Sequence, residues 1–305
     1  MADPLIVHHY TSTDTLLKIV TAEKGKECVW ATNIRFLNDT KERDHCREMI
    51  AHRLAQLDRN RWLESGYDFA AALSKIDESD WHTPYVASFS TDPDSLPQWR
   101  AYCPNGNGVS IGFRVASLKN ASLTRELIQG KIQPTKATLA AVQYLGSSNF
   151  DKVDSLLDNC VSEIECWRKE QNALPPEERT KADDDALLTS ILSRTCAHVK
   201  HASFGSEKEY RLTAPIDVFG AEGPLHFRSS RTTVIPYKKL FMPEWGNSTY
   251  GSGSKNSIFN DYFIDQIMVG PTPNPDLTVE ALRKLFLSKR LCPLIRKTEA
   301  PYRDL

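Results

Sequence analysis

The stretch Gly108–Arg114, with the sequence GVSIGFR, is the clearest β-strand signal in the chain. Its apolar residues Val109, Ile111 and Phe113 alternate with small, polar or charged ones. Successive side chains of a strand point to opposite faces of a sheet, so this alternation is typical of a strand with one buried face. The stretch therefore predicts a β-sheet, and the remaining segments are interpreted around it.

The segments around this strand mix strands and helices in no regular order. Upstream, Tyr85–Ser90 (YVASFS) has the composition of a second strand. Regular alternation of strand and helix would indicate a doubly wound parallel sheet, so the irregular order favours an α+β fold. We predict a single α+β domain over residues 1–305, with a helical insertion at about 147–203. Further strands are expected at 5–10, 28–31, 139–144, 207–213, 232–236 and 264–269, and helices at 12–23, 38–57, 62–76, 151–170, 184–200 and 277–287.

Composition excludes several classes of protein. The 305 residues are 40% hydrophobic and 25% charged, with a formal net charge of −1, which is typical of a globular protein. No stretch approaches the roughly 20 apolar residues of a membrane span, and the N-terminus lacks the pattern of a signal peptide. Seven cysteines without a CxxC pair and eight histidines without ligand spacing argue against a disulfide framework or a metal site. We predict a cytoplasmic protein without a metal or a membrane partner.

The segment 206–212, SEKEYRL, concentrates charge on a predicted strand. The period of two places Glu207, Glu209 and Arg211 on one face and turns Tyr210 and Leu212 toward the core. One interpretation is a solvated face joined by salt bridges. The other is a functional site, because adjacent carboxylates shift each other's pKa and stabilise positive charge.

The segment HHYTS near the N-terminus ends the first predicted strand. There His9 is positioned to bind a ligand hydroxyl or phosphate, with Tyr10 and Thr11 beside it. The alternative is a histidine that only caps the helix that follows. Both interpretations stay open at this point.

Two further segments hold candidate binding residues. In NDTKE, a capping box accounts for Asp39 and Glu42, whereas Asn38 is left to line a pocket. In the strand YVASFS, Ser88 and Ser90 share a face, where their hydroxyls suit a sugar or a catalytic carboxylate.

Two aromatic residues lie between the strands YVASFS and GVSIGFR. Trp99 and Tyr102 are three residues apart, so a helical turn would stack both on one side. Such a pair suits a planar base, and the alternative is that both belong to the core.

In order along the chain, HHYTS, FLNDTKE, YVASFS, DSLPQWRAY, GNGVSIGF, FGSEKEYRL and IDQIMVGP resemble an uncharacterised bacterial domain-of-unknown-function family, over roughly residues 6–290. That family is similar in turn to the ADP-ribosyltransferase superfamily, which cleaves the N-glycosidic bond of NAD on a split mixed β-sheet. The resemblance implies an arginine or histidine on the first strand, a serine or tyrosine on a middle strand and a glutamate, often within ExE, on a late strand. His9, Ser88 with Ser90, and Glu209 after Glu207 match these positions.

The chemistry implied is cleavage of an N-glycosidic bond through an oxocarbenium-like sugar, whose positive charge a fixed carboxylate stabilises. Glu209 is expected in this role and to hold a ribose hydroxyl, with Glu207 orienting or deprotonating the acceptor; which of the two is the catalytic carboxylate stays open. His9 binds a sugar hydroxyl or phosphate, and Arg211 tunes the carboxylates. Trp99 or Tyr102 stacks on the base.

Three functions are compatible with this site. The first is an NAD-consuming ADP-ribosyltransferase or NADase, in a toxin or in phage defence. The second is a DNA glycosylase that excises a modified base, and the third is a non-catalytic binding module. A DNA-binding role would use the local basic residues, whose other interpretation is ordinary solvated surface: Lys200 with His201, Arg228, Arg231, Lys238 and Lys239.

Overall fold

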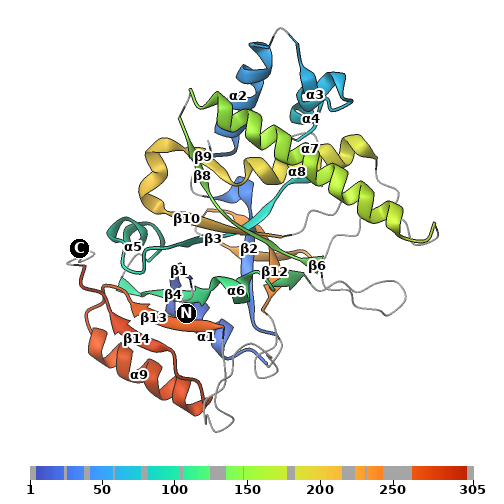
Figure 1. Ribbon diagram of the computed structural model, residues 1–305. Helices are drawn as coiled ribbons and strands as arrows, with labels where there is room; N and C mark the ends of the chain where they lie inside the picture. The colour runs from blue at the N-terminus through green and yellow to red at the C-terminus, as the bar shows by residue number, and fades with distance from the viewer. Residues whose placement is uncertain are drawn as a thin grey trace.

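A computed structural model describes residues 5–23, 26–37, 42–57, 59–76, 82–103, 106–123, 135–146, 148–176, 183–214, 224–230, 232–242 and 263–300. Twelve of the described strands form one large mixed β-sheet, and helices lie around it (Figure 1). Two more strands, β8 and β9, pair separately and in parallel. The predicted α+β class is confirmed.

The elements follow one another in the irregular order that the sequence predicts. The strands are β1 (Ile6–Ser12), β2 (Cys28–Asn33), β3 (Tyr85–Ser90), β4 (Gly108–Arg114), β5 (Ser122–Leu123), β6 (Thr135–Lys136), β7 (Thr138–Ala141), β8 (Gln143–Leu145), β9 (Val199–His201), β10 (Glu209–Thr213), β11 (His226–Ser229), β12 (Val234–Phe241), β13 (Ile264–Val269) and β14 (Leu294–Lys297). The α-helices are α1 (Thr13–Val20), α2 (Glu42–Ala55), α3 (Arg61–Glu64), α4 (Phe69–Lys75), α5 (Leu96–Tyr102), α6 (Val115–Leu118), α7 (Phe150–Ala173), α8 (Asp184–Cys196) and α9 (Pro275–Ser288). Short 3₁₀ helices include η1 (Ile34–Phe36) and η4 (Ala202–Glu207).

Strand β3 is the branch point of the sheet. One of its edges pairs with β10 over the whole stretch from Val86 to Ser90. The other edge is therefore shared: β2 pairs with Tyr85 and Val86 at one end, and β1 pairs with Ser90 alone at the other. Strands β1 and β2 thus diverge from opposite ends of one edge of β3. We call the gap between them the fork.

Strand β4 lies between β1 and β13 and is antiparallel to both. Its apolar side chains enter the main core as expected, but the opposite face is buried too. There His8 of β1 hydrogen-bonds with Ser110 at 3.1 Å and with Gln266 at 3.1 Å. A Cβ atom on Gly112 would lie 2.9 Å from the His8 ring, so glycine makes room for this histidine. The alternation in GVSIGFR reflects two different buried faces rather than one exposed face.

Helix α1 connects the two diverging strands. Ser12 caps it as predicted, because its hydroxyl accepts a hydrogen bond from the Thr15 amide at 3.2 Å. Leu16 and Ile19 pack into the core of the sheet, while the opposite side of the helix borders the fork. The capping-box residue Asp39 lies outside the described residues.

The predicted insertion forms part of a separate helical region. Helices α7 and α8 pack on α2 and α4 around a second hydrophobic cluster that includes Ile50, Leu157 and Leu192 (Figure 1). Helices α2 and α4 thus cover much of the apolar surface of α7 and α8. The single helix predicted at 62–76 is two helices, since Gly66 between them adopts a φ of +88°. None of the described helices has the length and apolar character needed to span a bilayer.

Candidate functional site

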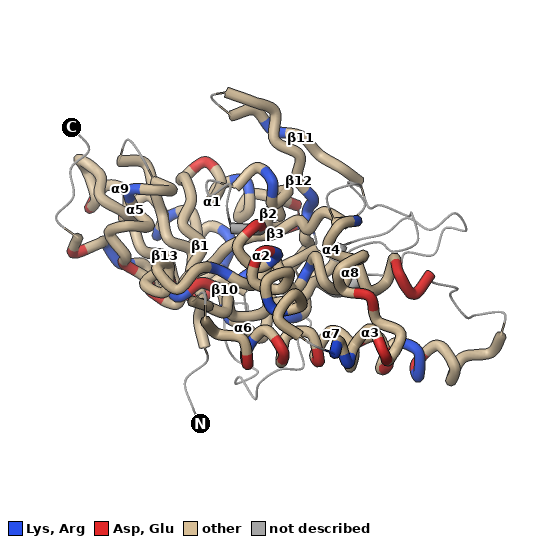
Figure 2. Tube along the Cα trace, turned by 90° about the horizontal axis from the view of Figure 1, so that it is seen from above, with Lys and Arg blue, Asp and Glu red and all other residues tan. Residues whose placement is uncertain are grey.

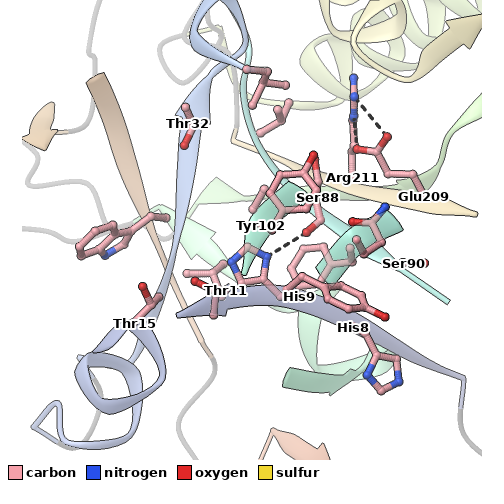
Figure 3. Close-up of a pocket in the computed structure, with 18 of the residues that line it drawn as sticks. His8, His9, Thr11, Thr15, Thr32, Ser88, Ser90, Tyr102, Glu209 and Arg211 are labelled. Carbon is pink, nitrogen blue, oxygen red and sulfur yellow. Dashed lines mark hydrogen bonds and ion pairs between the residues drawn. The ribbon is translucent and has the colours of Figure 1, made fainter. Parts of the chain in front are cut away.

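A cavity of about 1000 Å³ opens in the fork. Most of its lining residues come from β1, α1, β2, β3, α5, η4, β10, β11 and β12. Figure 3 shows His9 reaching from β1 toward β3, Glu209 and Arg211 side by side, and Thr15 and Thr32 on the far wall. The fork thus brings together side chains from opposite ends of the chain, and the split of the sheet is the reason.

The charged segment SEKEYRL is only partly a strand. Strand β10 begins at Glu209, whereas Glu207 ends the 3₁₀ helix η4. Lys208 between them has a φ of +47°, in the left-handed region. Because the backbone turns at Lys208, the side chains of Glu207 and Glu209 do not lie on one face of a strand. The predicted period-two face is therefore wrong for Glu207 and correct for Glu209 and Arg211. Leu212 packs in the core as expected, and Tyr210 packs partly against it.

Glu209 is buried in a network of cations. The Arg211 guanidinium donates from Nε to Oε1 at 2.7 Å and from Nη2 to Oε2 at 3.2 Å. The Lys200 ammonium lies 2.9 Å from Oε2. Burial alone would raise the pKa of Glu209, but the charges of Arg211 and Lys200 and a hydrogen bond from Ser88 outweigh it and lower the pKa to about 2. Glu209 is therefore ionised at any physiological pH.

Lys200 joins the two glutamates. Its Nζ atom also lies 2.5 Å from Oε2 of Glu207, so both carboxylates converge on one ammonium despite the kink at Lys208. The Lys200 side chain is only 4% exposed, against 26% for Glu207 and 6% for Glu209. Lys200 is therefore not ordinary solvated surface. Lys200 lies on β9, which pairs with β8 rather than with β10. Sequence reasoning missed its role because no local pattern shows that Lys200 meets the carboxylates of η4 and β10.

His9 faces the same cavity from the first strand. Its Nδ1 atom donates to the carbonyl oxygen of Ser88 at 2.9 Å, because a carbonyl can only accept (Figure 3). Burial lowers the pKa of His9, the bond to Ser88 opposes the shift, and the charge of Arg228 lowers the pKa further. The ring is therefore neutral near pH 7, with the lone pair on Nε2. This atom can accept a hydrogen bond from a ligand hydroxyl but cannot donate one to a phosphate.

The two serines of β3 are used differently. Ser88 lies opposite Arg211 in the register, and its hydroxyl bonds to Glu209. Ser90 donates to the backbone oxygen of Glu207 at 2.7 Å and accepts from the Asp92 amide at 3.1 Å. The hydroxyl of Ser90 therefore fixes the loop that carries Glu207.

Tyr10 borders the cavity, but its polar end points elsewhere. The Tyr10 hydroxyl donates to the Asp92 carbonyl at 2.7 Å and accepts from the Ser95 amide at 2.8 Å. Burial raises its pKa, so the hydroxyl stays protonated. The hydroxyl of Tyr10 is therefore engaged by the β3–α5 loop, and the role of Tyr10 in binding substrate stays a prediction. Thr11 lines the cavity as predicted.

Helix α5 separates the two predicted aromatics. Trp99 is fully buried and packs edge-on against Tyr10, with ring centroids 4.6 Å apart. Its indole Nε1 donates to Oδ1 of Asp94 at 2.7 Å. Tyr102 is 44% exposed and lines the cavity. The predicted stacking pair is wrong, because Trp99 is buried against Tyr10 whereas Tyr102 lies on the exposed side of the helix. Tyr102 is left as the aromatic residue of α5 at the cavity.

The far wall of the cavity was missed by sequence reasoning. Trp30 of β2 stacks on Tyr237 of β12 with ring centroids 4.5 Å apart, and Lys18 of α1 lies 5.5 Å from the Trp30 ring. Lys239 lies directly opposite Trp30 in the register. A short CVWA strand carries no signal for such a cluster, because its partners lie on elements far away in sequence.

Other predicted residues fall outside this arrangement. Asn38 and Arg231 lie outside the described residues, so their predicted roles are not tested. Lys238 is buried, with its ammonium 4.9 Å from the Tyr85 ring, and is not solvated surface. Within the described ranges, no group of three or more His, Cys, Asp or Glu is placed to hold a metal ion.

The segment from α5 to β10 carries several of the cavity residues. Residues 98–212 match a family model described as Protein of unknown function (DUF2971). The match agrees with the predicted resemblance to a domain-of-unknown-function family, over a shorter stretch than expected. Tyr102, Lys200, Glu207, Glu209 and Arg211 lie inside the matched segment, and His9 and Ser88 precede it. No curated protein and no solved structure matches the chain, so the likeness to ADP-ribosyltransferases stays a prediction.

Proposed function

We propose that the protein is an enzyme that cleaves an N-glycosidic bond, with NAD as substrate and with water or a second molecule as ADP-ribosyl acceptor. One observation carries the proposal. The fork brings His9 of the first strand, Ser88 of a middle strand and Glu209 of a late strand to one cavity. These are the positions that the motif resemblance assigns to the site.

In the proposed reaction, the bond between the anomeric carbon and the nicotinamide nitrogen breaks, and its electron pair leaves with the base. Positive charge develops on the anomeric carbon and the ring oxygen. Preorganised carboxylates stabilise such charge without reorganising at the moment of reaction. The acceptor oxygen then bonds to the anomeric carbon and releases its proton.

The geometry supports different roles for the two glutamates. A carboxylate offers about four acceptor sites, and Glu209 already receives two bonds from Arg211, one from Lys200 and one from Ser88. We therefore assign to Glu209 a fixed negative charge behind the sugar rather than a bond to a ribose hydroxyl. The more exposed Glu207 is the better group to orient the acceptor and take its proton.

The remaining contacts suit a nucleotide. Nε2 of His9 accepts a hydrogen bond from a ribose hydroxyl, and Tyr102 offers an exposed ring at the cavity for a base. The volume of about 1000 Å³ is at the upper end of the range usual for small-molecule sites, which leaves room for a dinucleotide.

The direct test incubates the full-length protein with NAD and separates the products by chromatography. We expect free nicotinamide, together with ADP-ribose or an ADP-ribosylated acceptor. Glu209→Gln should release far less nicotinamide, and Asp154→Asn is its matched control, because it also replaces a carboxylate held by two arginine bonds, but in the helical region. Absence of nicotinamide from reactions with intact protein would reject NAD as the substrate.

A DNA glycosylase is the second candidate, and Arg228 and Lys239 favour it because both line the cavity and would meet backbone phosphates. The buried positions of Lys200 and Lys238 remove two of the residues first considered for this role. Abasic sites formed in modified phage DNA, without added NAD, would support this alternative. If the protein shows neither NAD cleavage nor base excision, the non-catalytic binding module is the function that remains.

A further inference from the structure

The cavity has two chemically different ends. At the β10 end, the carboxylates of Glu207 and Glu209 are matched by the cations of Lys200 and Arg211. At the opposite end, three cations line the wall with no matching carboxylate. Lys18, Arg228 and Lys239 form no ion pair with any acid among the described residues.

These three cations surround one short piece of β2. Lys18 lies over the Trp30 ring, and Lys239 is the cross-strand neighbour of Trp30. Arg228 donates from Nη2 to the hydroxyl of Thr32 at 3.2 Å. Trp30 and Thr32 are one pleat repeat apart, or about 7 Å along the strand, and share a face. The cations are therefore gathered at two adjacent positions of one wall.

We propose that this wall, made of Lys18, Arg228 and Lys239 around Trp30, is a binding subsite for phosphate ester groups of the substrate. The inference rests on the proposed function for its connection to the glycosidic site, and it deepens that function by naming the anion. Two neighbouring phosphate groups, in a diphosphate or along a nucleic acid backbone, carry enough negative charge to engage both cationic positions. A carboxylate ligand would use only one of them.

The position of Arg228 connects the two ends of the cavity. Arg228 and His9 line the same cavity, and the charge of Arg228 is close enough to lower the pKa of His9, so the phosphate wall adjoins the histidine. Figure 2 shows the ribbon of β11 and β12, which carries Arg228 and Lys239, projecting from the rest of the sheet. A ligand bound along this wall would therefore extend from the glycosidic site toward the ribbon.

Phosphate chemistry has two sources here, a dinucleotide such as NAD or the backbone of a nucleic acid strand. Three like charges around one wall repel each other when nothing is bound, and burial already lowers the pKa of Arg228. A binding role thus predicts that removing one cation weakens binding and leaves the melting temperature unchanged or higher. A merely structural role predicts a lower melting temperature.

The experiment measures binding by calorimetry on the full-length protein, with ADP and with a single-stranded thymidine decanucleotide as separate probes. The variants are Lys239→Gln and Arg228→Gln. Lys284→Gln is the control, because it removes one positive charge from α9. Since a charge-assisted bond is worth about 1.5–3 kcal/mol, we expect each cavity variant to weaken binding by roughly tenfold to hundredfold.

The probes separate the two sources, and the outcome does not depend on catalysis. Binding of ADP with no binding of the oligonucleotide supports a dinucleotide. Binding of the oligonucleotide supports a nucleic acid strand if the slope of log K against log salt concentration decreases by about one for each cation replaced. Failure of both probes to bind, or binding that neither substitution weakens, would overturn the subsite. Failure of NAD cleavage with intact ADP binding would overturn only the proposed reaction.

Discussion

The helical region and the fork both contain ion pairs, but the two sets differ in exposure. In the helical region, Arg61 and Asp158 join α3 to α7, with side chains that are 60% and 52% exposed. Figure 2 shows acidic and basic residues interspersed along this surface. At the fork, the Arg211 and Glu209 side chains are 1% and 6% exposed.

The two sets of ion pairs also differ in what they can contribute to stability. Exposed pairs contribute little, about 0–1 kcal/mol each. Buried pairs carry a large desolvation cost, and apolar side chains of similar size would often stabilise the fold as well or better. A buried cluster of two acids and two cations beside a cavity is therefore a feature that packing does not require, and we infer that chemistry requires it.

The largest effect on stability is expected at the fork. Arg211→Gln would leave the charge of Glu209 buried with only Lys200 against it. Breaking one partner of a buried pair costs about 3–5 kcal/mol, so the free energy of unfolding should fall by this amount in denaturant titrations. A loss below about 1 kcal/mol would show that the Arg211–Glu209 pair contributes no more to stability than an exposed ion pair does.

A matched control separates this loss of stability from loss of the site. Leu157→Ala removes a fully buried side chain from the helical cluster and should cost about 2–5 kcal/mol. At a temperature where both variants are folded, the Leu157 variant should keep wild-type cleavage and the Arg211 variant should lose it. Equal cleavage activity in the two variants would contradict the claim that the charged cluster at the fork is needed for the reaction.

A pH effect of intermediate size is expected from His8, which is buried within the sheet. Burial lowers its pKa to about 4, against 6.5 for an ordinary imidazole. The unfolded chain therefore binds a proton that the folded protein does not, and stability falls as the pH drops from about 6.5 to about 4. The contribution of His8 is on the order of 3 kcal/mol.

His8→Gln tests this, because glutamine keeps a donor and an acceptor and does not titrate. The variant should lose less unfolding free energy than wild type between pH 7 and pH 4. The other histidines are shared by both proteins, so their effects cancel in the comparison. Parallel pH profiles would show that His8 is not the titrating group.

The smallest effect is expected at the helical surface. Arg61→Gln removes the exposed pair with Asp158, and the unfolding free energy should change by less than about 1 kcal/mol. Cleavage should be unaffected. A loss as large as that of Arg211→Gln would abolish the distinction between the two regions.

Local patterns predicted several elements of the fold correctly. The strands Gly108–Arg114 and Tyr85–Ser90 have the bounds that their sequences indicate, and Ser12 caps α1. The fork itself was not derivable from periodicity, because sharing one edge of β3 between β1 and β2 depends on long-range pairing.

The site was predicted where the signal was local and missed where it was not. His9, Ser88, Glu209 and Arg211 all border the cavity. The period-two pattern failed at Glu207 because it cannot detect a left-handed residue at Lys208. Spacing alone could not separate Trp99 from Tyr102, since packing on Tyr10 decides which is buried.

Charged residues missed by sequence reasoning share one property. A lysine next to a histidine, such as Lys200, has the same local signal whether it is solvated or buried against two carboxylates. The same holds for Lys18 and Lys239 around Trp30. Their roles arise from strands and helices that meet only in the folded protein.

The most direct test of the account compares the rates of nicotinamide release from NAD by the wild-type protein and Glu209→Gln, both shown to be folded at the assay temperature. Losing a preorganised charge in such a site typically lowers turnover by about 10²–10³, and we predict a decrease of that size. Full turnover in Glu209→Gln would contradict the central role of the buried cluster.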